Sequence, residues 1–135
     1  MWKNWKFILA ACLMATAAPT ISGHLAAQDD KVAQLMKRKL THSQKILEGI
    51  AVNDFDLIVR NAEELIIISK TVEWRVLKTP QYEVHSNDFR RIAEQLVTQA
   101  KAKNSDGAAL AYVDLTLTCV KCHKHVREIR MAKAD

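Results

Sequence analysis

Glycine and proline are scarce in this chain of 135 residues, which has three glycines and two prolines. There is no glycine-rich loop of the kind that holds phosphate groups. No stretch alternates strictly between apolar and polar residues as a half-buried strand would. Internal repeats and low-complexity tracts are also missing. These absences favour a helical chain without a nucleotide-binding loop.

Aromatic residues make up only 6% of the chain, and none of them is interleaved with a run of basic residues. The formal net charge is nevertheless +5, from 20 Lys and Arg against 15 Asp and Glu. A basic balance of this size without a basic, aromatic-rich patch is not evidence for nucleic-acid binding. We therefore predict no nucleic-acid partner.

The first 27 residues have the pattern of a secretory signal peptide. Lys3 and Lys6 give a basic start, residues 7–18 are apolar, and residues 25–27 are small enough for cleavage before Gln28. The apolar run is too short for a spanning helix, which needs roughly 20 residues. We predict a cleaved signal, a periplasmic product and no membrane span in the mature chain. Two alternatives carry less support: a buried first helix, and a lipoprotein signal ending at Cys12.

Residues 28–135 then form one domain of 108 residues (135 − 27). Apolar residues recur in it at intervals of three and four, which indicates amphipathic helices throughout. The spacing predicts helices starting near Asp29, Asn53, Ser86 and Ala108, with Asn53 and Ser86 as N-caps. The first of them is expected to turn Met36, Leu40 and Leu47 inward. We predict an all-α fold, an antiparallel up-down four-helix bundle.

The chemistry is concentrated in one motif. Cys119, Cys122 and His123 form Cys-x-x-Cys-His, the attachment signature of c-type haem. On a helix, cysteines three apart face the same side, so both can bond the vinyl groups of one porphyrin. His123 then becomes an axial ligand of the iron. Thioredoxin-like chemistry, a zinc site and a plain disulfide are the alternatives, and none of them explains the histidine together with the signal peptide.

The signal peptide, the four helices and the motif near the C-terminus resemble the cytochrome c-prime family and its low-spin relatives. The resemblance implies one covalent haem c and a basic residue beside its proximal side, which Arg127 matches; Val126 departs from an aromatic residue often found there. It also implies that the first helix covers the distal face of the haem. Met36 is then the first candidate for a sixth ligand, Leu40 an apolar cover that leaves iron five-coordinate, and His42 a further candidate ligand. The aromatic residues that line the haem or fill the core are Trp74, Tyr82, Phe89 and Tyr112.

Two functions stay open on this basis. A six-coordinate iron suits one-electron transfer with a redox partner protein, and this is the function we predict. A five-coordinate iron behind an apolar cover suits binding of nitric oxide or carbon monoxide. No enzymatic role is expected, because no acid–base residue apart from His42 falls on the distal side. A homodimer is compatible with either function.

Overall fold

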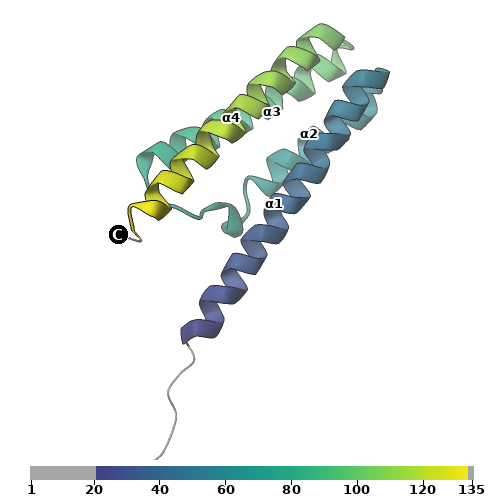
Figure 1. The fold of residues 1–135 in the computed structure, drawn as a ribbon. Helices are drawn as coiled ribbons and strands as arrows, with labels where there is room; N and C mark the ends of the chain where they lie inside the picture. The colour runs from purple at the N-terminus through teal and green to yellow at the C-terminus, as the bar shows by residue number, and fades with distance from the viewer. Residues whose placement is uncertain (1–20, 134–135) are drawn as a thin grey trace, which may run out of the picture.

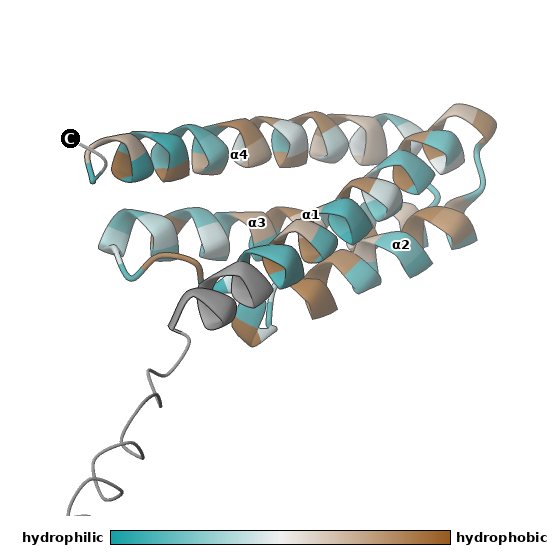
Figure 2. Cartoon of the chain, turned by 60° about the horizontal axis from the view of Figure 1, so that its bottom comes forward, coloured by the Kyte–Doolittle hydropathy of each residue, from teal (hydrophilic) through white to brown (hydrophobic). Residues whose placement is uncertain are grey.

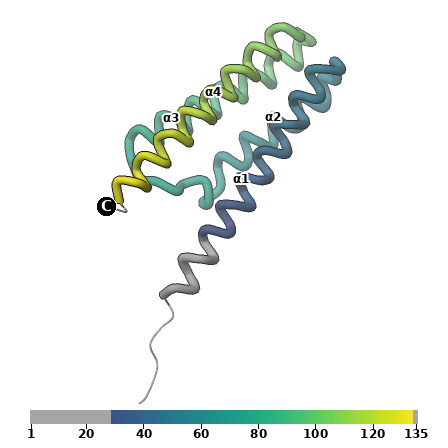
Figure 3. The backbone as a smooth tube through the Cα atoms, viewed as in Figure 1, coloured from purple at the N-terminus to yellow at the C-terminus, as the bar shows by residue number. Residues whose placement is uncertain are grey.

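The computed structural model describes residues 21–133, with side chains described from residue 29. Its elements are α1 (Ile21–Val52), α2 (Phe55–Ile68), the 3₁₀ helix η1 (Val72–Trp74), α3 (Pro80–Lys101) and α4 (Ser105–Met131). Figures 1 and 3 show α2 returning beside α1 and α4 returning beside α3. The predicted all-α, four-helix fold with up-down order is thus confirmed. Residues 1–20, including Cys12, lie outside the described residues.

No helix in the described part of the chain is long and apolar enough to cross a membrane. In Figure 2, hydrophilic and hydrophobic residues alternate along each helix. The buried faces of the helices meet in one core. Its fully buried large side chains are Ile46, Ile58, Leu65, Ile68, Leu96 and Leu115. Helix α1 packs along α2, α2 along α3, and α3 along α4, whereas α1 and α4 make few direct contacts.

Helix α1 starts earlier than the sequence indicated. It is continuous from Ile21, whereas the predicted start was near Asp29. Residues 25–27 are Leu-Ala-Ala, strong helix formers that continue the helix across the predicted cleavage position. Cleavage before Gln28 would therefore remove residues 21–27 of α1 and leave the rest of the helix in place.

The turn between α1 and α2 is built differently from the prediction. Asp54 is the N-cap of α2, and its Oδ1 accepts a hydrogen bond from the Leu57 amide at 2.9 Å. Asn53 is not the cap; its φ of 57° ends α1 in the left-handed conformation that asparagine tolerates. Gly49 allows the two helices to approach closely, since a Cβ there would lie 2.8 Å from Ile58 Cγ1.

The predicted start of α3 at Ser86 is wrong. The helix begins at Pro80, and the Thr79 hydroxyl caps it by accepting from the Tyr82 amide at 3.2 Å. Proline fits the first helical position because that residue's amide has no intrahelical partner. Ser86 instead lies buried inside the helix, where its Oγ accepts a hydrogen bond from Trp74 Nε1 at 2.9 Å.

Helix α4 begins at Ser105, three residues before the predicted Ala108. Its N-cap is Asn104, whose Oδ1 accepts from the Gly107 amide at 3.0 Å. The helix ends at Met131.

The inward face of α1 is also corrected. Leu40 is 59% exposed and Leu47 is 52% exposed, so neither belongs to the core. Lys39, which is 8% exposed, occupies the buried position beside Leu35 and Ile46. A lysine can fill such a position because its four-carbon stem packs as an apolar chain. Leu40 therefore lies outside the inward stripe of α1 in which the sequence analysis placed it.

Candidate functional site

Helix α4 presents the two motif cysteines to the interior of the bundle. Cys122 is 9% exposed, Cys119 is half-buried, and both thiols are free. Thr118, the residue before Cys119, donates a hydrogen bond from its hydroxyl to the Asp114 carbonyl oxygen at 3.0 Å, so its polar group needs no partner across the bundle. The three-residue spacing has the geometric consequence expected of a helix: both sulfur atoms face the same side. His123 comes next on α4 and is exposed.

Cys122 and His123 line a cavity of about 300 Å³. Side chains from α1, η1, the start of α3 and the C-terminal half of α4 form its walls. The lining residues are Val32, Met36, Lys39, Trp74, Val76, Tyr82, Cys122, His123, Val126, Arg127 and Arg130. This volume is at the lower end of the roughly 300–1,000 Å³ found for ligand and cofactor pockets. Four segments distant in the sequence thus converge on the motif.

Of the two candidate sixth ligands predicted from the sequence, one lines the cavity and the other does not. Met36 lies on α1, is half-buried and lines the cavity together with His123 and Arg127. His42 does not line it. Its Nδ1 lies 2.9 Å from Asn61 Oδ1, which ties the ring to α2. Of the α1 candidates, only Met36 shares a cavity with the motif.

The four aromatic residues singled out in the sequence differ in whether they line the cavity. Trp74 and Tyr82 line the cavity, and the Tyr82 hydroxyl donates a hydrogen bond to the Trp74 carbonyl oxygen. Phe89 lies behind Trp74, with ring centroids 5.0 Å apart. Tyr112 lies elsewhere, with its hydroxyl 3.2 Å from Ser43 Oγ, and links α4 to α1. Two of the four aromatic residues therefore face the cavity directly.

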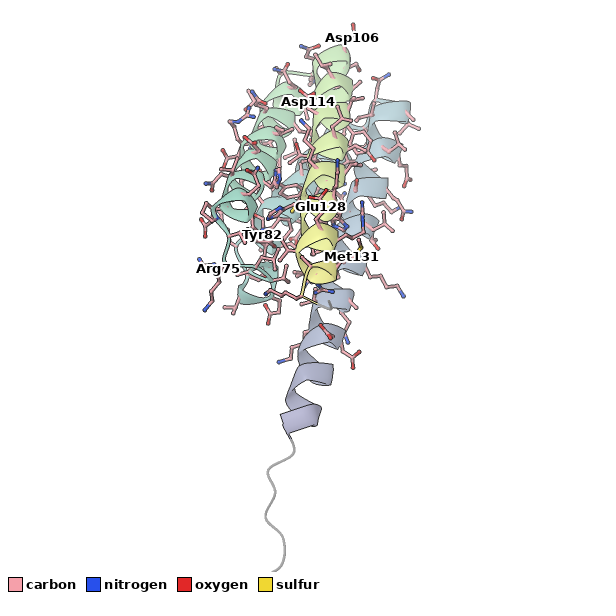
Figure 4. The ribbon with its side chains drawn as sticks, turned by 60° about the vertical axis from the view of Figure 1, so that its left-hand side comes forward. Arg75, Tyr82, Asp106, Asp114, Glu128 and Met131 are labelled. Carbon is pink, nitrogen blue, oxygen red and sulfur yellow. The ribbon has the colours of Figure 1, made fainter. Side chains whose placement is uncertain are left out.

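A larger cavity of about 530 Å³ lies on the other side of Trp74 and Tyr82. It is bordered by basic residues that include Lys70, Arg75 and Lys78, and it contains no cysteine or histidine. Figure 4 shows Arg75 and Tyr82 toward the end of the bundle where Met131 lies, and Asp106 at the opposite end. Because the reactive side chains line the smaller cavity, that cavity is the candidate site.

The electrostatics of the site favour the neutral forms of His123 and Cys122. The pKa of His123 is lowered from its usual value, first because its ring is partly withdrawn from solvent and then because the Lys39 and Arg127 cations lie nearby. Burial raises the pKa of the Cys122 thiol, and the Lys39 cation partly opposes this rise. A neutral imidazole has a free lone pair for a metal ion. The cavity thus offers the His123 imidazole, the Cys122 thiol and the Met36 thioether, and the half-buried Cys119 lies on the same side of α4 without lining the cavity.

Sequence reasoning missed Lys39. The signal that points to it is its register, four residues after Leu35 and seven before Ile46, both of which are buried.

In the described part of the chain, no three side chains of His, Cys, Asp or Glu gather into a group that could hold a metal ion.

Comparisons of the whole chain with protein families, with curated proteins and with solved structures find no significant match. The resemblance to a family therefore stands on the residues and the arrangement of helices described above.

Proposed function

We propose that this chain is an exported monohaem c-type cytochrome that transfers single electrons. In this proposal Cys119 and Cys122 hold haem c through thioether bonds, and His123 is the axial ligand of its iron. The haem supplies a one-electron redox centre when it is bound. A redox partner protein outside the cytoplasm would exchange electrons with it.

The observation that carries the proposal is the convergence of the motif with a cavity. Cys-x-x-Cys-His lies on one continuous helix, and Cys122 and His123 open onto a pocket bounded by three other segments. The donor set fits the group, since both thiols are free and Cys122 and His123 line the same pocket. Arg127 and Arg130 at the same cavity are cations suited to the haem propionates.

Residues of this chain have distinct parts in the proposed carrier. The two thioether bonds would fix the haem relative to α4, so that His123 would be held at high effective concentration beside the iron. Met36 is the α1 side chain able to complete the ligand set, and an axial thioether raises the reduction potential. Val32, Trp74 and Val76 give that side of the pocket an apolar surface. A fixed set of ligands would limit rearrangement between the oxidation states.

A five-coordinate binder of nitric oxide or carbon monoxide is the second candidate function. The observation in its favour is the cavity itself, which lies beside α1 and reaches His123. The exposure of Leu40 counts against it, because that residue does not supply the apolar cover. Electron transfer is therefore the function that we propose first.

Haem attachment tests the proposal directly. The protein, exported together with a haem-attachment system, should keep its haem after extraction with acidified acetone and give a c-type pyridine haemochrome spectrum. Cys119→Ala and Cys122→Ala should each largely abolish stable attachment. Lys121→Ala, which changes an exposed side chain between the two cysteines, should not. Haem that extracts freely from the wild-type protein would show the proposal to be wrong.

A further inference from the structure

Lys39 is a charged side chain buried inside the candidate haem cavity. It lies on α1 three residues after Met36, is 8% exposed and lines the cavity together with Cys122 and His123. Its Nζ is 4.5 Å from the ring centroid of Trp74 and 4.4 Å from that of Phe89. The ammonium group is thus held against two aromatic rings at the cavity wall.

In the described part of the chain, no acidic side chain pairs with this charge. The four ion pairs in residues 29–133 all join exposed side chains, and none of them includes Lys39. The cavity lining contains Lys39, Arg127 and Arg130 but neither Asp nor Glu. Burying a charge without a partner is costly, and folded proteins avoid it unless the charge has a use. The faces of two aromatic rings recover part of that cost, because their electron-rich surfaces attract a cation.

The surroundings of Lys39 change when the thiols react. Burial lowers the pKa of Lys39, and the neighbouring Cys119 and Cys122 only partly oppose that fall. Thioethers have no proton to lose and cannot become anionic. In a haem-bound protein the two aromatic rings and the bound group itself would then be the remaining partners of the ammonium.

We propose that Lys39 sets the reduction potential of the proposed cytochrome by fixing a positive charge inside its haem cavity. This inference rests on the proposed function. Reduction adds one electron to the iron, so a nearby cation stabilises the reduced state more than the oxidised state. Coulomb interactions are stronger in a buried site than in water. Arg127 is exposed, so solvent and salt screen its charge more than that of Lys39.

The test compares reduction potentials of the haem-loaded, full-length protein. Lys39→Gln removes the charge without adding a strong iron ligand, and Lys39→Leu is a second neutral variant in case the first folds poorly. The matched control is Lys37→Gln, which removes an exposed cation two residues away on α1. We expect the neutral Lys39 variants to favour oxidation by about tenfold, a potential lower by about 59 mV for one electron. The optical spectra should stay unchanged, and Lys39→Arg should restore most of the potential.

Three other results of these measurements would overturn the proposed role of Lys39. Potentials equal to that of the wild type, or a shift no larger than that of Lys37→Gln, would overturn the inference. A changed spin state in Lys39→Gln would show that the amine binds iron, and this also would overturn the role as a charge. A wild-type protein without covalent haem would refute the proposed function and the inference together. Equal potentials in haem-loaded protein would refute the inference alone.

Discussion

Met36 is the side chain on α1 whose chemistry separates the two proposed functions. If its sulfur binds iron, the oxidised protein should be low-spin and show a weak near-infrared band of sulfur–iron charge transfer. Met36→Leu should then give high-spin iron that binds carbon monoxide. The fold should survive, because the two side chains have similar volumes and such exchanges cost less than about 1.5 kcal/mol. Optical spectra and carbon monoxide titration measure both effects.

Met131→Leu is the control for Met36→Leu, because Met131 is 67% exposed at the end of α4. It should leave the spectrum unchanged. A wild-type protein that is already high-spin would rule out methionine ligation and favour gas binding. Low-spin iron without the sulfur band would point to another ligand, which His42→Ala tests.

Tyr82 makes stability depend on pH at the alkaline end. The tyrosine is 4% exposed, and burial raises its pKa to about 12, while the unfolded value is about 10. The unfolded chain therefore loses this proton first. The contribution of Tyr82 to stability is intact below pH 10 and is lost as the pH rises toward 12.

Tyr82→Phe should remove this part of the pH dependence. Between pH 10 and 12 the wild type should lose roughly 2–3 kcal/mol more unfolding free energy than the variant. At pH 7 the variant should be about 1 kcal/mol less stable, because the hydrogen bond to the Trp74 carbonyl is gone. Urea denaturation across this pH range gives both values. If the unfolding free energies of the two proteins changed with pH in the same way, Tyr82 would not be the source of the alkaline pH dependence.

At the scale of the elements, each of α2, α3 and α4 begins at a side-chain cap. Asp54, Thr79 and Asn104 each accept a hydrogen bond from the backbone amide three residues later. Such caps satisfy amides that have no partner within the helix. They define the residue at which each of these helices begins after its connection.

Asn104→Ala should therefore destabilise the domain by about 1 kcal/mol. The reason is the loss of the acceptor for the Gly107 amide at the start of α4. Asn104→Asp keeps an acceptor at the same place and should stay close to the wild type. Urea denaturation followed by far-ultraviolet circular dichroism measures the difference. A midpoint for Asn104→Ala that equals that of Asn104→Asp would show that the cap is not needed.

At the scale of the whole molecule, export and haem attachment are expected to occur together. Mass spectrometry of the exported protein should give a chain that starts near Gln28 and carries the added mass of one haem. The helix that crosses this position in the full chain would then begin later, close to Asp29. A mature protein that begins with a lipid-modified Cys12 would show that the prediction of a plain signal peptide is wrong.

Local pattern was enough to predict four helices, the starts of α2 and α4 to within three residues and the motif on the last helix, whereas the start of α3 was six residues off. The errors in helix starts came from cap chemistry. Asn53 is as suitable a cap as its neighbour Asp54, Ser86 is as suitable as Thr79 seven residues earlier, and Pro80 can end one segment or begin the next. Only the packed chain selects among such neighbours, because the choice depends on where the helix axis must enter the bundle.

The sequence by itself determined the helical class and the spacing of Cys119, Cys122 and His123, since both follow from short-range periodicity. The tertiary structure alone decided which residues meet that motif. It placed Met36 at the cavity and tied His42 to Asn61, and it turned Leu40 outward and buried Lys39 instead. The physical reason is that the rotation of α1 about its axis depends on its contacts with α2 and with the segment around Trp74. A lysine stem packs there as well as a leucine does, and a hydropathy pattern cannot express that equivalence.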